Sequence, residues 1–186
     1  MPDSRIVFAG NPWPEGHPIK AFEWLASERD GQVWFDLHLA TQDYDAERRI
    51  RDDDEEDEDA EPRSDWESPV VWNNYHACTL SSNFWHDGGF AVGAVGGVTL
   101  ESLDGLQVTV DSPPPEDIEA NAFHVYLLGH DAAAHHAIRF ARIGGTDRFD
   151  IHWVGKLAMA YRGDYDYKHA FEARIFDVEA PRLPGR

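Results

Sequence analysis

The chain has 186 residues, enough for one folded unit whose core needs neither a disulfide nor a metal. Its hydrophobic content of 42%, with 7 Trp, 10 Phe and 6 Tyr, excludes a disordered chain, and 35 acidic against 16 basic residues give a net charge of -19. That charge argues against binding to nucleic acid or to an anionic membrane, because both depend on Lys and Arg that neutralise phosphates.

The longest apolar run near the N-terminus, residues 6–9, is too short for a signal peptide or a membrane span. Cys78 is the only cysteine, so no disulfide can form within the chain, which agrees with a reducing compartment. We therefore expect a soluble, cytoplasmic protein with a single β-domain over residues 1–186.

The first predicted element is a β-hairpin. Its arms, residues 19–27 and 32–39, flank Asp30-Gly31, a dipeptide that suits a type I′ turn because both central positions need positive φ. A helix over residues 18–30 is the alternative, since Pro18 suits a first helical turn and Gly31 suits a helix end. The second arm is the firmer strand, because apolar and polar residues alternate along it.

An acidic insert follows, at about residues 46–66. Nine of its ten central residues are acidic, and such a tract repels itself and has nothing to bury, so we expect it to be disordered. These carboxylates are the predicted partner-binding residues: Asp52, Asp53, Asp54, Glu55, Glu56, Asp57, Glu58, Asp59 and Glu61. Calcium binding is not expected there, because the tract lacks the spacing and the glycine of a calcium loop.

Three further strands are predicted after the insert, at residues 70–80, 88–97 and 105–110. The middle strand holds five glycines, which indicates that another backbone comes close or that the sheet bends. A nucleotide-binding glycine loop is the alternative, but the spacing fits neither GxGxxG nor a P-loop. Acidic residues after Pro115 predict a single helical turn near residues 116–119.

The C-terminal part predicts four strands, at residues 123–128, 136–143, 148–162 and 167–178, joined by short turns. Strands joined this tightly form an antiparallel meander. Large apolar residues alternate with smaller or polar ones most clearly along the third strand. Its predicted inward face holds Phe149, Ile151, Trp153, Gly155, Leu157, Met159 and Tyr161. About eight strands with at most one or two short helices predict an all-β fold, an antiparallel β-sandwich or a flattened barrel.

Histidines invite a metal interpretation. The densest group, His130, Asp131, His135 and His136, falls in the predicted turn HDAAAHH, where solvated histidines are the simpler explanation. No ligand pattern such as C-x-x-C or HExxH is present, so we expect no metal site and no cofactor. Cys78 stands among small and apolar residues, as an inert core thiol does.

The function favoured by the composition is noncatalytic. We expect an acidic protein that binds a basic protein partner, for instance an immunity or antitoxin-type inhibitor of a toxin that cleaves nucleic acid. One alternative is a metal-assisted β-barrel enzyme that uses His76, His124, His152 and His169. Another is a carbohydrate or small-ligand binding module on the polar face formed by Trp34, Asp36 and His38. A homo-oligomer is compatible with the sequence.

The acidic tract is predicted to be dispensable for folding, because Ala60 is its only apolar residue. Replacing residues 52–61 by a short Gly/Ser linker should leave the free energy of unfolding unchanged or raise it slightly, through relief of like-charge repulsion. Thermal unfolding followed by circular dichroism measures this. Loss of a cooperative transition in the linker variant would show that the tract is part of the folded structure.

Overall fold

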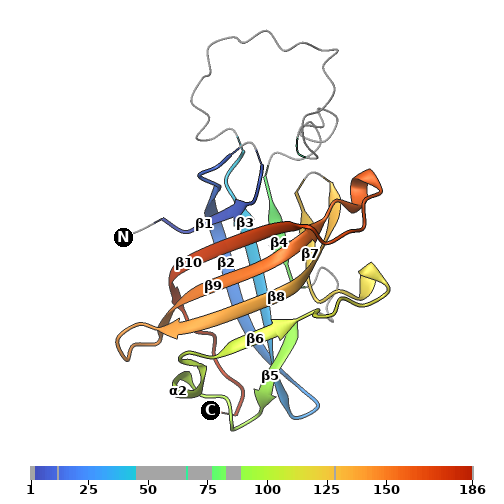
Figure 1. Cartoon of the computed structure of the whole chain (residues 1–186). Coiled ribbons are helices and arrows are strands. Elements are labelled where there is room, and N and C mark those ends of the chain that lie inside the picture. Colours follow the sequence, from blue (N-terminus) through green and yellow to red (C-terminus); the bar gives the residue numbers. More distant parts are fainter. Residues whose placement is uncertain are drawn as a thin grey trace, which may run out of the picture.

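The computed structural model describes residues 3–11, 13–44, 66, 77–82, 89–127 and 129–185. Strands make up 53% of these residues and helices 7%. Eight strands close into an antiparallel barrel (Figure 1). They are β1 (Arg5–Phe8), β2 (His17–Arg29), β3 (Gln32–Thr41), β4 (Thr79–Ser81), β7 (His124–Tyr126), β8 (His130–Arg142), β9 (Arg148–Ala158) and β10 (His169–Glu179).

The ring runs β2, β1, β10, β9, β8, β7, β4, β3, and the pairing of β3 with β2 closes it. Two outer strands, β5 (Phe90–Ala94) and β6 (Gln107–Val110), pair with β3 and β8 respectively. They occupy the ends of those long strands that β4 and β7 leave unpaired. The fold is therefore the barrel rather than the sandwich of the two predicted architectures.

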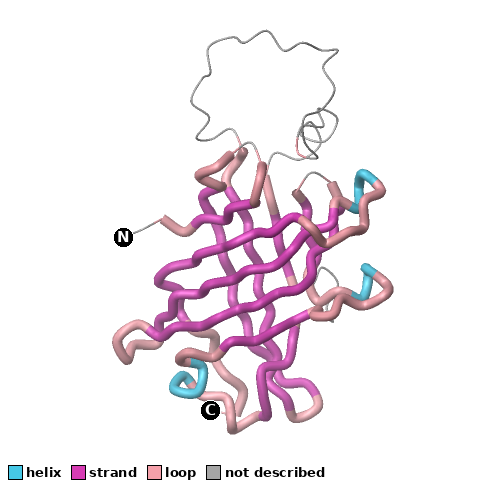
Figure 2. Tube along the Cα trace, in the orientation of Figure 1, coloured by secondary structure: helices cyan, strands magenta, loops and turns pink. Residues whose placement is uncertain are grey.

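Helices are short and lie at the ends of strands (Figure 2). The one α-helix in the described residues, α2 (Leu100–Leu103), starts at a capping box between Thr99 and Ser102. Two 3-10 turns, η1 (Ile118–Ala120) and η2 (Ala160–Arg162), complete the set, and η1 is the helical turn expected after Pro115. No helix in the described part of the chain is both long enough and apolar enough to cross a membrane.

The predicted hairpin is confirmed. Arg29 pairs with Gln32, and the two residues between them have positive φ, 50° at Asp30 and 73° at Gly31, as the type I′ turn requires. The alternative helix over residues 18–30 is therefore wrong. The strand pairing extends over residues 19–41, which makes this hairpin one of the longest ladders of the barrel.

The glycine-rich strand also behaves as predicted. It forms β5 against β3, and Gly89 lies so close to that strand that a Cβ atom would sit 2.4 Å from the carbonyl oxygen of Phe35. Of the strand predicted at residues 70–80, the described residues include only 77–80, and β4 accounts for its end.

The C-terminal meander is confirmed as β7–β8–β9–β10, but one of its predicted turns is wrong. The HDAAAH segment was expected as a turn, whereas β8 starts at His130 and runs through it. The chain actually turns near Gly129, where the Leu127 amide donates to the Gly129 carbonyl. Small alanines suit this strand because they fit between packed neighbours: Ala133 and Ala134 are fully buried.

The third strand of the meander ends earlier than predicted. β9 stops at Ala158, the chain turns into η2, and Tyr161 is 47% exposed instead of lying on the inward face. The Tyr161 ring packs on Gly129, where a Cβ atom would lie 2.4 Å from its Cγ. The other large side chains of the predicted inward face are buried, at 2% exposure or less: Phe149, Ile151, Trp153, Leu157 and Met159.

Aromatic and aliphatic side chains from every long strand fill the middle of the barrel. Trp24 of β2 stacks on Phe140 of β8 at 4.9 Å between ring centroids, and Trp153 of β9 packs on Phe123 at 4.6 Å. Phe35 joins the two groups through Phe140 and Phe90. The interior is therefore a packed core that joins opposite walls.

Trp153→Ala should lower the free energy of unfolding by about 3 to 5 kcal/mol, the usual cost of truncating a large buried aromatic residue. Denaturant titration measures this loss. Tyr165→Ala is the matched control, because Tyr165 is 59% exposed and its loss should cost less than about 0.5 kcal/mol. A Trp153→Ala cost below about 1 kcal/mol would contradict the packed core.

Candidate functional site

A β-bulge interrupts the pairing of β8 with β9. The register passes from Ala134 opposite Lys156 to Ala137 opposite Val154, so two residues, His135 and His136, face the single residue Gly155. His135 takes the left-handed conformation with φ 54°. Bulges of this kind re-aim side chains, and they are frequent beside binding and catalytic sites.

Gly155 leaves space that its neighbours fill from inside the barrel. A Cβ atom there would lie 2.6 Å from the Phe171 ring and 2.9 Å from Nδ1 of His136. His136 is fully buried and also packs on Phe123, at 4.4 Å between ring centroids. Any larger residue at position 155 would therefore displace an aromatic ring of the core.

Burial keeps His136 neutral. Its Nδ1 accepts a hydrogen bond of 3.1 Å from the Trp153 indole Nε1, so the proton of the neutral ring is on Nε2. Nε2 has no hydrogen-bond partner among the described residues. Removal from water lowers the pKa of His136 to about 3, since the surrounding aromatic rings cannot replace the hydration of an imidazolium ion.

Polar groups gather on the outer side of the bulge. The His135 amide donates to the Asp111 carbonyl at 2.9 Å, and Asp111 also has positive φ, 49°. The Asp111 carboxylate accepts from the Ala122 amide, while partial burial raises its pKa. Asn121 Nδ2 donates to both the Ala133 carbonyl and the Tyr167 hydroxyl, at 2.9 Å each, and so ties the loop before β7 to β8 and to the segment before β10.

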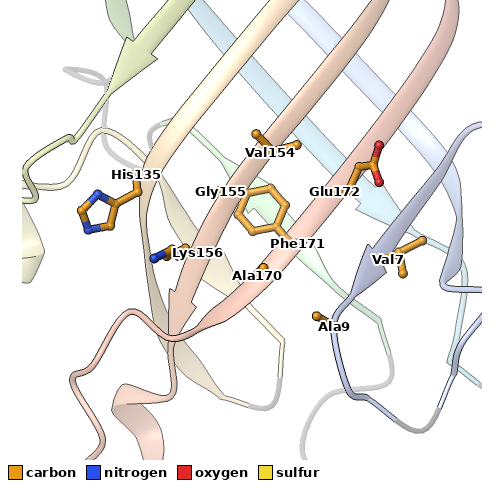
Figure 3. A pocket seen from close by; sticks show the side chains of 9 residues that line it. All are labelled: Val7, Ala9, His135, Val154, Gly155, Lys156, Ala170, Phe171 and Glu172. Carbon is orange, nitrogen blue, oxygen red and sulfur yellow. The ribbon is translucent and has the colours of Figure 1, made fainter.

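A shallow groove of about 460 Å³ opens next to this cluster on the outer face of the barrel (Figure 3). Small and apolar residues of β9, β10 and the end of β1 form its floor. Charged and polar side chains border it: His135 and Lys156 on one side and Glu172 on the other. The lining residues are Val7, Ala9, His135, Val154, Gly155, Lys156, Ala170, Phe171 and Glu172.

This arrangement suits binding better than covalent chemistry. Ser112 Oγ lies 3.3 Å from Nδ1 of His135, the spacing of a loose nucleophile–base pair. Within the described part of the chain, however, no carboxylate hydrogen-bonds to the other ring nitrogen to orient the imidazole, and both residues are at the surface. An apolar floor between charged borders instead fits an extended chain segment or a small amphiphile.

The predicted site residues lie elsewhere. The acidic tract, Asp52–Glu61, falls outside the described residues. Trp34, Asp36 and His38 share the outer face of β3 as expected, and all three are half-buried. The Arg29 guanidinium lies over the Trp34 ring at 5.1 Å, so it occupies one face of the ring that a sugar would need.

The histidines considered for the enzyme alternative do not converge where they are described. His152 is exposed on the outer face of β9, His124 lies on β7, and His169 lies at the start of β10 against Trp66. His76 is outside the described residues. The histidine cluster is also divided, since His135 points outward and His136 inward. No group of three His, Cys, Asp or Glu side chains in the described part of the chain could hold a metal ion.

Cys78 is fully buried, and desolvation raises the pKa of its thiol far above the usual value. Its backbone amide donates to the Thr41 hydroxyl at 2.9 Å. A thiol held neutral in this way is a poor nucleophile, so Cys78 acts as a core residue.

Sequence reasoning missed the bulge and the contacts around it. Two signals pointed toward it: a glycine on the inward face of the best-defined strand, and adjacent histidines that break the alternation of β8. Neither signal identifies its partner, because the opposition of Gly155 to His135 and His136 depends on the pairing register.

Stability should depend on His136 under mild acid. Its pKa is lower in the folded protein than the unfolded value of 6.5, so its neutral form stabilises the fold above pH 6.5 and this stabilisation is lost as pH falls toward about 3. Between pH 7.5 and pH 5 the loss should be about 2 kcal/mol. His136→Gln should flatten the pH dependence by that amount in urea titrations, whereas Tyr165→Ala, at an exposed position, should leave the pH dependence of the wild type. Equal pH dependence in the wild type and His136→Gln would contradict this account.

The chain matches no protein-family model, and neither the curated proteins nor the solved structures include one detectably similar to it. The roles of its residues therefore rest on the geometry of the barrel and on its charge.

Proposed function

We propose that this protein is a noncatalytic, cytoplasmic binding protein that presents acidic surface to a basic protein partner. The net charge of -19 is the single observation that carries the proposal, because a field of that size attracts cationic partners and repels nucleic acid and anionic membranes. The acidic tract Asp52–Glu61 supplies nine of these charges.

The packed barrel supports a role for the outer surface. Large rings occupy its centre, and Phe35, Phe140 and Trp153 are fully buried there. A barrel that carried a small ligand inside would need a lined cavity in this position. The described groove opens instead on the outside, next to the β8 bulge.

The described residues on either side of the segment that contains the acidic tract, Tyr44 and Trp66, are both buried. Tyr44 is buried, and its hydroxyl donates to the Leu127 carbonyl at 2.7 Å. Trp66 is 2% exposed and packs on Phe8 at 6.0 Å, while Phe8 packs on His17 and His17 on Tyr44. The two described residues that flank the segment, Tyr44 and Trp66, therefore belong to one connected group of aromatic side chains.

An immunity or antitoxin-type inhibitor is the specific form of the proposal. A toxin that cleaves nucleic acid carries a basic surface to hold phosphates, and an acidic protein can cover that surface. Such an inhibitor needs a stable scaffold and matching charge but no active site. In this form the partner captured from the native host is a basic nuclease, and the barrel protein inhibits it.

The rate of association should fall steeply with salt. Since the Debye length shrinks from about 30 Å at 0.01 M to about 8 Å at 0.15 M, screening should slow encounter while dissociation changes little. Replacing the acidic residues of the tract by Asn and Gln should slow association by about tenfold at low salt and leave a specific complex. Affinity capture from the native host, followed by stopped-flow kinetics, measures both effects.

The matched control is a scrambled tract with the same composition, which should associate as fast as the wild type because it keeps the charge. A captured partner that is neutral or acidic would contradict the proposal. An association rate that does not change with salt concentration would also contradict it.

A further inference from the structure

A row of basic side chains crosses the outer face of the barrel. Arg5 on β1 pairs with Arg174 on β10, Arg174 with His152 on β9, and His152 with Arg139 on β8. Residues directly opposite each other in an antiparallel ladder point to the same side of the sheet, so the row is continuous. At about 4.8 Å between strands it spans roughly 15 Å.

This face is open in the described structure. The sheet of β1, β10, β9, β8 and β6 forms one side of the barrel, and no helix of the described chain crosses it (Figure 1). Arg174, His152 and Arg139 are exposed. Arg139 has no ion-pair partner among the described residues, and the same is true of exposed Lys156, which lies on the opposite side of the groove.

One carboxylate of the chain itself already contacts two members of this row. Glu172 Oε1 accepts from the Arg174 Nε at 2.7 Å and lies 2.8 Å from Nε2 of His152. These hydrogen bonds hold the pKa of Glu172 below its usual value, and the bond from Arg174 has the larger effect. The side chains of this row therefore have the right geometry for a carboxylate, and Glu172 uses part of their capacity.

Next to the basic row the groove offers an apolar floor. Val7 pairs with Glu172, Glu172 with Val154, and Val154 with Ala137, so three of four positions in the adjacent row are small or apolar. Basic side chains therefore flank an apolar strip, with Arg139 and Arg174 on one side and Lys156 on the other. In an extended segment, side chains two residues apart share a face and lie about 6.7 Å apart, as do those of His152, Val154 and Lys156 along β9. A segment that lies along the strands, with acidic, apolar and acidic residues at positions i, i+2 and i+4, therefore matches this pattern in both charge and spacing.

We propose that this outer face binds an extended acidic segment of a protein partner, with apolar side chains in the groove and carboxylates on Arg139, Arg174 and Lys156. The inference goes beyond the proposed function, because it assigns a second surface whose charge is opposite to that of the whole protein. Nucleic acid is the less suitable occupant, because a net charge of -19 repels a long polyanion. A short acidic segment interacts mainly with the Arg and Lys side chains next to it, since salt screens the more distant acidic residues.

The test uses the full-length protein and a fluorescein-labelled nonapeptide in which pairs of Glu and Val alternate (EEVVEEVVE), so that each face of the extended peptide carries both residue types. Binding is measured by fluorescence anisotropy at about 0.05 M salt. The charge-reversed double variant Arg139→Glu/Lys156→Glu should weaken binding by at least about tenfold. Glu172→Gln should strengthen it several-fold, because it releases Arg174 and His152. Arg182→Glu is the matched control: it changes an exposed cation in the chain after β10 and should bind like the wild type.

Two exposed positions are changed in the double variant, so its unfolding temperature should match that of the wild type and confirm an intact fold. Equal affinity of the wild type and the folded double variant would overturn the proposal, and so would equal weakening by Arg182→Glu. Displacement of the peptide by an oligothymidylate of the same charge more readily than by unlabelled peptide would also overturn it, and would make the face a general polyanion site. A Lys/Val nonapeptide that binds as tightly would show that charge does not select the ligand.

Discussion

Closure of the barrel is the constraint on which the rest of the structure depends. β1 has four residues, yet it pairs with both β2 and β10 and so joins the N-terminal hairpin to the C-terminal meander. Ile6 and Phe8 of this strand are buried in the core. Without β1, two long strands would present unpaired edges, which invite association with other chains.

Contacts at the start of β2 explain how so short a strand is held. Gly16 has φ 68°, and a Cβ atom there would lie 2.3 Å from the Ile6 carbonyl oxygen. Only glycine tolerates both that conformation and that approach. Arg5 reinforces this contact, because its guanidinium donates to the Glu15 and Gly16 carbonyls. Local backbone geometry and a few side-chain bonds therefore position the strand that completes the ring.

The packed centre of the closed barrel is the reason why we propose a function for its outer surface. The inner positions belong to the core. Even His136, the buried histidine at the β8 bulge, is kept neutral by burial among aromatic side chains. The outer positions of the β1–β10–β9–β8 face carry a basic row, although the chain as a whole is acidic. Such a separation of charge orients a partner as well as attracting it.

The sequence predicted those parts of the fold that depend on local pattern. The hairpin followed from Asp30-Gly31, and the buried face of β9 followed from its alternation up to Met159. β1 was missed because four residues give too short a pattern, and its importance comes only from pairing with strands distant in the sequence. The start of β8 was taken for a turn because alanine gives no periodic signal and its neighbours are polar.

The bulge and the basic row could not be predicted for a related reason. The bulge at His135 and His136 shifts the alternation of β8 by one residue. Ala133 is buried before the bulge, at an odd position, whereas His136, Ile138 and Phe140 are buried after it, at even positions. The basic row exists only when four strands take their observed register. Residue types alone identify neither feature, because each arises from residues far apart in the sequence.

The central claim is that this barrel binds its partners on the outside and leaves its interior undisturbed. Two-dimensional NMR of the isotopically labelled protein, with and without the captured partner, tests it most directly. The account predicts shifts of backbone amides at outward-facing positions, while the Trp153 indole signal and the ring signals of His136 stay in place. Shifts centred on Trp153 and His136, with the outer positions unchanged, would mean that the ligand enters the barrel, and would contradict the account.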